Sequence, residues 1–177
     1  MDFKGSETEA NLRRAFAGEA YSRSKYDLFA EAARREGYEQ LAAFFEEAAQ
    51  NEQAHARIWL RALSELGTTE ENLANAAESE NALWTYVYTG MAQTARAEGF
   101  VELASRFEGV ARADRAHEVR FLKLLENVRR NQVFHRGGPV LWCCRNCGHL
   151  ELEKNAPLNC PVCGAPQGFF QIRAENY

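Results

Sequence analysis

The segment RADRAHEVRF, residues 112–121, carries an aspartate and a histidine where a helix that faces a core should carry aliphatic side chains. Val110 and Phe121 belong to an apolar stripe with the three- and four-residue steps of an amphipathic helix, and Asp114 and His117 fill the gap in that stripe. A charged pair on the apolar face of a helix needs a chemical reason, because burying a charge without a partner is costly.

The same pattern occurs a second time, 62 residues earlier in the chain. When residues 36–63 are laid over residues 98–125, Glu52 aligns with Asp114 and His55 aligns with His117. The chain therefore contains an internal helical-hairpin repeat.

Helix boundaries follow from capping patterns and glycines. Ser6 with Glu9, and Thr68 with Glu71, have the spacing of a capping box, and Pro is absent before Pro139. Glycines at positions 37, 67 and 99 are plausible helix ends. These signals predict four helices over residues 7–36, 38–66, 69–97 and 99–129.

Each of the other two helices also places one carboxylate on its apolar face, Glu19 in the first and Glu80 in the third. Four buried carboxylates need compensation, and two divalent cations would supply it. Residues at i and i+3 project from one helix face, so each acid–x–x–histidine pair can offer one oxygen and one nitrogen to a metal, and Glu19 and Glu80 could bridge the two ions. A single pair of this kind is common on solvated helices, but two at repeat-equivalent positions match the ligand set of dinuclear carboxylate bundles. The expected ligands are Glu19, Glu52, His55, Glu80, Asp114 and His117.

Composition limits the possible partners and location. The net charge is −4, and no block of Lys and Arg is present, so a nucleic-acid surface is not expected. The N-terminal residues lack the apolar core of a signal peptide, and no stretch approaches the ~20 apolar residues of a membrane span. We therefore expect a cytoplasmic protein that does not bind membranes.

All five cysteines lie near the C-terminus, after a basic, glycine-containing stretch that breaks the helical period. Two Cys-x-x-Cys pairs predict one site with four thiolates, in which glycines after the second and fourth cysteines let amide N–H groups point at sulfur. Sulfur ligands alone do not choose between iron and zinc. Cys143 is a spare thiol, and the remaining histidines are not expected to bind metal. The expected ligands are Cys144, Cys147, Cys160 and Cys163.

The whole chain resembles the rubrerythrin family, in which a ferritin-like di-iron bundle precedes a rubredoxin domain. The residues that carry this resemblance are Glu19 in EAYSRSKY, Glu52 and His55 in NEQAH, Glu80, Asp114, His117, Trp142, CRNCG, Pro157 and CPVCG. The resemblance implies an all-α four-helix ferritin-like bundle over residues 1–130, a linker over 131–140 and a small rubredoxin-like S4 module over 141–177.

The resemblance also implies an activity. The dinuclear iron site would reduce hydrogen peroxide to water with electrons passed through the rubredoxin-type iron, which an electron-donor reductase would recharge. Manganese or zinc could replace iron in the bundle, and zinc could replace it in the four-cysteine site. Tyr26 and Tyr88, one near each single glutamate, are interpreted as core aromatics, with a supporting role beside the ligands as the alternative.

Two residues depart from the family pattern. Members usually carry a further glutamate one turn after the third-helix ligand, where this chain has Leu83, and a glutamate in place of Asp114. These departures predict slower peroxide turnover, or a six-ligand site like that of other ferritin-like oxidases. The alternatives are a dioxygen-using oxidase or ferroxidase and, independently of these departures, a non-enzymatic adaptor with a zinc ribbon and a structural metal bundle.

The connection between the second and third helices is short. A ferritin-like bundle needs a connection along the ~40 Å length of a helix here, whereas a few residues around Gly67 reach at most ~18 Å. Either the helices follow a plain up-down order or they are exchanged with a second chain. We expect a homodimer with exchanged helices.

Overall fold

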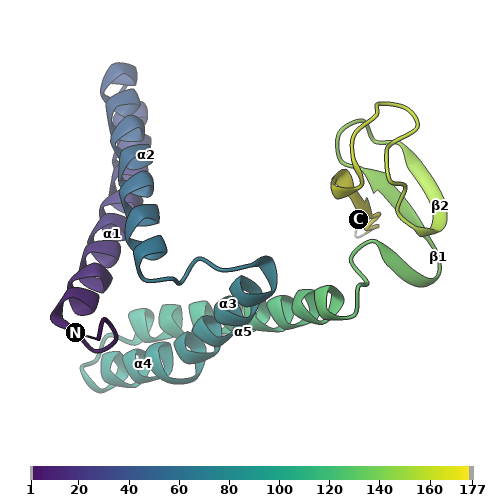
Figure 1. The fold of residues 1–177 in the computed structure, drawn as a ribbon. Helices are drawn as coiled ribbons and strands as arrows, with labels where there is room; N and C mark the ends of the chain where they lie inside the picture. The colour runs from purple at the N-terminus through teal and green to yellow at the C-terminus, as the bar shows by residue number, and fades with distance from the viewer. Residues whose placement is uncertain (1, 176–177) are drawn as a thin grey trace. The chain divides into compact units, whose positions relative to one another are not determined.

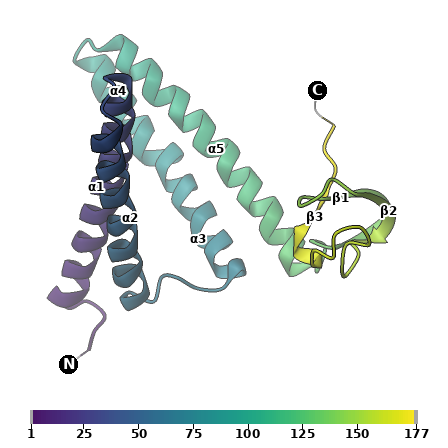
Figure 2. The same ribbon diagram turned by 90° about the horizontal axis from the view of Figure 1, so that it is seen from above.

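The computed structural model describes residues 2–175, in which helices come first and a small sheet follows. Contacts divide the chain into two compact units, residues 1–68 and 69–177. The first unit is a helical hairpin of α1 (Glu7–Arg35) and α2 (Glu39–Ala62), which lie side by side in Figures 1 and 2.

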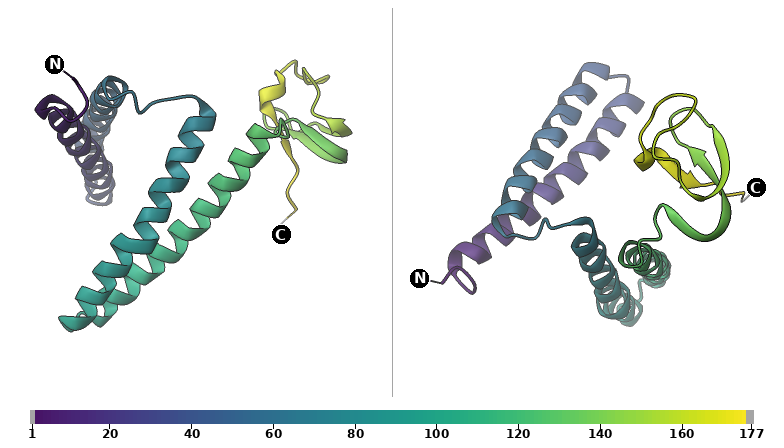
Figure 3. Two further views of the ribbon diagram at one scale, coloured as in Figure 1. Left: turned by 60° about the horizontal axis from the view of Figure 1, so that its bottom comes forward. Right: turned by 45° about the vertical axis from the view of Figure 1, so that its right-hand side comes forward.

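The second unit opens with another hairpin. Its first arm consists of α3 (Thr69–Ala82), the π-helical segment η1 (Leu83–Val87) and α4 (Tyr88–Ala97), and its second arm is α5 (Val101–Arg129). Figure 3 shows α5 running alongside the first arm. The four predicted helices are therefore present as two hairpins, the elements of a ferritin-like bundle.

Most predicted boundaries agree with the structure. The Ser6 hydroxyl accepts a hydrogen bond from the Glu9 amide at 3.1 Å, and Gly37 and Gly99 end their helices with φ of +86° and +87°. The expected end at Gly67 was wrong, because α2 stops at Ala62. Ser64 takes the left-handed conformation, with φ of +57°, and the Glu65 amide donates to the Leu60 carbonyl, which closes the helix early.

Each hairpin has its own core, and the buried positions of the two cores match at an offset of 62 residues. Alanines line the contact between the helices of each hairpin and are almost fully buried, which lets the helices approach closely. Buried pairs with this offset are Ala30 and Ala92, Ala33 and Ala95, Ala42 and Ala104, and Leu63 and Leu125. The internal repeat predicted from the sequence is thus a repeat of packing.

The π-helical segment explains a shift in this repeat. Glu80 follows Glu19 by 61 residues, whereas Tyr88, beyond η1, follows Tyr26 by 62. One residue has therefore been added between these positions, and a π-helical turn absorbs one extra residue without breaking the helix. The sequence predicted a continuous helix over 69–97 and missed this segment.

The C-terminal module is a three-stranded antiparallel sheet of β1 (His135–Cys144), β2 (Leu150–Asn155) and β3 (Phe170–Ile172), with β1 in the centre. A short helix, η2 (Gln167–Phe169), precedes β3. Trp142 is 1 % exposed and donates from Nε1 to the Glu153 carbonyl at 3.0 Å. It packs with Phe170 and Ala156 around the buried cysteines. Strand β1 begins at His135, within the stretch expected to be a linker.

Candidate metal centres

The first hairpin brings Glu19, on α1, together with Glu52 and His55, on α2. His55 Nδ1 lies 3.2 Å from Glu52 Oε2 and 3.7 Å from Glu19 Oε2. One ligand atom from each of the three residues lies within 4.8 Å of the others. We call these three residues the first cluster.

The second hairpin forms the matching group from Glu80, on α3, and Asp114 and His117, on α5. His117 Nδ1 lies 3.5 Å from Glu80 Oε1 and 3.9 Å from Asp114 Oδ1. Their ligand atoms also lie within 4.8 Å of one another. This second cluster uses repeat-equivalent positions on α5, so the six predicted residues form two groups of three.

The donor set of the second cluster fits a cation. Asp114 is the one charged residue buried among those the structure describes, at 8 % exposure. Its Oδ2 atom and the Oε2 atom of Glu80 are buried and accept no hydrogen bond from the described residues. Buried carboxylate oxygens without a donor are unfavourable, and a metal ion is the partner that satisfies two of them together with an imidazole.

The first cluster is already held by hydrogen bonds. A hydrogen bond with Glu52, and then one from Trp59, lowers the pKa of Glu19, and the nearby His55 imidazole lowers it further. Trp59 Nε1 lies 3.4 Å from Glu19 Oε1. Glu19 therefore stays ionised, as a metal ligand must. Sequence reasoning missed Trp59, although its place one turn after His55 on the same helix face was a signal.

Both histidines are more exposed than predicted. The side chains of His55 and His117 are 51 % and 47 % exposed, whereas the sequence placed them in a core. Two helices cannot enclose the face on which their own ligands project. Each hairpin therefore presents its cluster on an open face.

The four predicted cysteine ligands converge in the C-terminal module. The Sγ atoms of Cys144 and Cys163 are 3.8 Å apart, and those of Cys147 and Cys160 are 3.6 Å apart. A tetrahedral site with metal–sulfur bonds of about 2.3 Å has sulfur–sulfur edges of about 3.8 Å. The four thiols are thus spaced for one metal ion, and Cys143 is not in the group.

Two equivalent turns hold these cysteines. The amides of Gly148 and Gly164, with φ of +78° and +72°, donate to the carbonyls of Cys144 and Cys160 at 2.8 and 2.9 Å. The residue after each glycine then directs its amide to a sulfur: the His149 amide donates to Cys147, and the Ala165 amide donates to Cys163. This agrees with the amide–sulfur contacts predicted from the glycines.

The sulfur cluster is electrostatically uneven. Hydrogen bonds from the Asn146 side chain and the Ala165 amide lower the pKa of Cys163 to about 6. Although the His149 amide acts in the opposite direction, hydrogen bonding with the neighbouring sulfurs raises the pKa of Cys147. Cys163 is therefore the first thiol to ionise, and the sequence alone did not single out Asn146.

Tyr26 and Tyr88 pack against aromatic rings, and His149 lies beside a carboxylate. Tyr26 packs against Phe45 and Tyr88 against Phe107, with ring centroids 6.4 and 6.1 Å apart. Among the described residues neither tyrosine hydroxyl has a hydrogen bond to a ligand carboxylate. His149 Nε2 lies 3.0 Å from Glu151 Oε2.

In residues 2–175 no helix is both long and apolar enough to cross a membrane.

Comparison with known proteins agrees with this geometry. A rubrerythrin family model matches residues 10–86 and 71–138, and a model described as the rubredoxin-like domain of rubrerythrin matches residues 142–171. Rubrerythrin from Porphyromonas gingivalis is 42 % identical over 98 % of this chain and 94 % of its own length, and rubrerythrin-1 from Clostridium acetobutylicum is 39 % identical over 98 % of each. A solved structure of nigerythrin is 25 % identical over 97 % of this chain and 89 % of that one, with a TM-score of 0.37. With two relatives near 40 % identity along almost its whole length and both domain models matched, the chain belongs to the rubrerythrin family.

Proposed function

We propose that this chain reduces hydrogen peroxide to water, using the two clusters together as one dinuclear site and the four-cysteine centre as the route for electrons. Its family binds a di-iron site and a rubredoxin-like iron. The observation that supports the proposal is that two matched carboxylate–histidine clusters and one four-sulfur cluster occur in a single chain.

The reaction consumes one peroxide, two electrons and two protons and releases two waters. When bound, a pair of iron ions supplies the two electrons for cleavage of the O–O bond, and a four-sulfur iron returns electrons one at a time. The four carboxylates Glu19, Glu52, Glu80 and Asp114 balance the charge of two divalent ions. His55 and His117 donate ring nitrogens and must be neutral to do so.

Two departures from the family pattern support a second candidate, a dioxygen-using oxidase or ferroxidase. Leu83 offers no oxygen one turn after Glu80, and Asp114 is one methylene shorter than a glutamate. The bundle then has six ligands, two carboxylates and one histidine per ion, which is the set found in other di-iron carboxylate proteins. The reduced metal site of a peroxidase reacts fastest with peroxide, whereas that of an oxidase reacts fastest with dioxygen.

Anaerobic reduction followed by a stoichiometric peroxide titration tests the proposal. The chain should contain about three irons, show the red colour of thiolate-to-iron absorption, and be oxidised by peroxide much faster than by dioxygen in stopped flow. Oxidation by peroxide no faster than by air favours the oxidase, and a colourless protein that holds only zinc favours the adaptor.

The partner of each hairpin is a second copy of the chain in this proposal. Large apolar side chains stay exposed on both hairpins, although their buried cores are mostly alanine. Such faces need another helical layer. Exposed examples are Leu28, Phe29, Leu41, Phe44, Met91, Leu103, Val110 and Leu124.

The length of the connection favours exchange. Residues 63–68 join α2 to α3 and span at most about 25 Å, whereas the arm Thr69–Ala97 is about 43 Å long. A bundle with α2 and α3 parallel needs the longer distance, so the first hairpin of one chain would pair with the second hairpin of its partner. Each dinuclear site would then take one cluster from each chain.

The same proposal assigns a role to each part of the chain. Residues 1–130 would form the bundle, 131–140 the linker and 141–177 the electron-transfer module. An external reductase would reduce the four-cysteine iron. Metal-loaded protein that accepts electrons from a chemical reductant at the four-cysteine site, but does not pass them to the bundle, would contradict this route.

A further inference from the structure

Glu118 fastens the π-helical segment to α5. Its Oε1 atom accepts a hydrogen bond from Asn81 Nδ2 at 2.9 Å, and its Oε2 atom accepts one from Trp84 Nε1 at 2.6 Å. Asn81 precedes η1 and Trp84 lies within it. Both carboxylate oxygens therefore hold the segment at the point where the extra residue is inserted.

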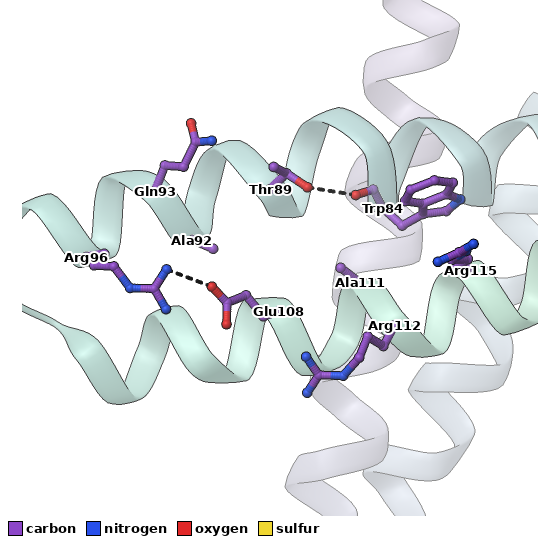
Figure 4. Close-up of a pocket in the computed structure, with 9 residues that line it drawn as sticks. All are labelled: Trp84, Thr89, Ala92, Gln93, Arg96, Glu108, Ala111, Arg112 and Arg115. Atoms are coloured by element: carbon purple, nitrogen blue, oxygen red, sulfur yellow. Dashed lines mark hydrogen bonds and ion pairs between the residues drawn. The ribbon is translucent and has the colours of Figure 1, made fainter.

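Two other side chains hold the same tryptophan. The Thr89 hydroxyl donates to the Trp84 carbonyl at 2.9 Å, and the Arg115 guanidinium lies 5.4 Å from the centre of the indole ring. Figure 4 shows Thr89 and Arg115 on either side of Trp84, away from the Arg96–Glu108 ion pair. Contacts to the indole N–H, the backbone carbonyl and the ring face of Trp84 thus fix the segment.

The first hairpin has no equivalent of this arrangement. The position that corresponds to Glu118 is Ala56, and α1 is a continuous α-helix from Glu7 to Arg35. There, Trp59 donates directly to the ligand Glu19. The Glu118 contacts are therefore specific to the hairpin that carries the inserted residue.

Glu118 is next to the second cluster on both helices. It follows His117 and lies one turn after Asp114 on α5, while its partner Asn81 follows Glu80 on α3. Because the buried Oε2 of Glu80 accepts no hydrogen bond from the described residues, the placement of its helix decides where this carboxylate points. We propose that Glu118 is a positioning residue, which holds η1 so that Glu80 faces Asp114 and His117. This inference rests on the dinuclear site proposed above.

The variant Glu118→Leu tests the role. Leucine is close to glutamate in size but offers no acceptor, so the Asn81 amide and the Trp84 indole N–H both lose their partner. Mn²⁺ is a suitable probe because it prefers oxygen and nitrogen ligands to the four thiols. In electron paramagnetic resonance, the unsubstituted protein should show a coupled pair and about two bundle ions per chain, and Glu118→Leu should show an uncoupled ion and about one.

Glu118→Gln is the conservative variant. Its side-chain oxygen accepts from Trp84 Nε1, and its NH₂ group donates to Asn81 Oδ1 after the Asn81 amide turns over. It should keep the coupled signal, although it lacks the charge of Glu118. Loss of the coupled signal in Glu118→Gln, as in Glu118→Leu, overturns the inference that these hydrogen bonds position the cluster.

Glu108→Leu is the matched control. Glu108 also lies on α5, and its carboxylate pairs with Arg96 of the first arm at 2.8 Å, away from the second cluster. This variant should keep the coupled signal. A coupled pair in Glu118→Leu equal to that of the unsubstituted protein overturns the role of Glu118, whereas absence of a coupled pair from the unsubstituted protein overturns the dinuclear site itself.

Discussion

His55 Nδ1 lies 3.7 Å from Glu19 Oε2, and 3.5 Å separates the equivalent atoms of His117 and Glu80. In both hairpins the histidine of one helix thus meets the glutamate of the other. The difference lies in the oxygens that remain, because two of them in the second cluster are buried without a donor.

Asp114→Asn should stabilise the metal-free protein and abolish the gain from metal. Removing a buried charge without a partner should raise the free energy of unfolding by about 1 kcal/mol in chelator. Excess metal at about 100 times Kd should stabilise the parent by about 2.7 kcal/mol at the affected site, and this gain should vanish in the variant. Thermal unfolding with and without Mn²⁺ measures both effects.

Glu126→Gln serves as the control for that experiment. Glu126 is an exposed carboxylate on the same helix, 2.9 Å from Arg130, and such pairs contribute little to stability. Its metal-induced stabilisation should equal that of the parent. Equal behaviour of Asp114→Asn and Glu126→Gln would remove Asp114 from the ligand set.

Mixing two inactive variants should restore activity if the hairpins are exchanged. Glu52→Ala disables the first cluster and Asp114→Ala the second. In an exchanged heterodimer one site combines both defects and the other is intact. After co-refolding of equal amounts, half the dimers are mixed and half of their sites work, so about a quarter of parent activity should return.

The control is to mix the same variants without unfolding them. Little activity should appear, because exchange requires the hairpins to separate. No recovery after co-refolding, with dimers present by light scattering, would show that each site is built within one chain.

The metal-free four-cysteine module should titrate one thiol near neutral pH. The pKa of Cys163 is lowered to about 6, first by the Asn146 side chain, so thiolate absorbance should rise as pH increases through about 6. Below that pH the proton competes with metal, and uptake should slow as pH falls. Asn146→Ala should move the step to higher pH, whereas Arg145→Ala should leave it in place. A step unchanged by Asn146→Ala would show that this side chain does not set it.

Leu83→Glu should increase the rate of oxidation by peroxide. Leu83 is half-buried and lies one turn after Glu80, so a carboxylate there can reach an ion at the second cluster. An added anionic ligand stabilises the more highly charged oxidised state, and we expect about a tenfold gain, equivalent to ~1.4 kcal/mol. Leu83→Gln has the same size without the charge and should show no gain. Equal rates in the two variants would mean that charge at this position is irrelevant.

Gly37→Ala should destabilise the first hairpin by about 1 kcal/mol, because Gly37 has φ of +86° and an alanine is strained there. Gly18 lies inside α1, and a Cβ added there has no neighbour within 4 Å, so Gly18→Ala should stabilise the hairpin by up to about 1 kcal/mol. Chemical denaturation compares the two. Equal effects would show that the left-handed turn is not needed.

Much of the fold could be predicted from local patterns. The capping serine, the glycines at 37 and 99, and the spacing of the acid–x–x–histidine pairs act within one or two turns, so they can be read from sequence alone. The four cysteines were equally clear because their spacing is short and specific to a metal site.

What the sequence missed depends on contacts between helices or on alternative turns. No residue type marks a π-helical segment. In the sequence, η1 shows only when the spacing of Glu80 and Tyr88 is compared with that of their counterparts in the repeat. Ser64 ends α2 where Gly67 was expected, since either residue could take the left-handed turn. Glu118 was passed over because its partners lie on another helix.

The extra residue in η1 makes the two halves of the bundle inequivalent. A perfectly duplicated hairpin would surround both ions identically, and neither would have reason to react before the other. One added residue rotates Glu80 and its neighbours relative to everything after them, and the symmetry is broken at the ligand shell. A single added residue is therefore enough to give the two proposed metal positions different surroundings.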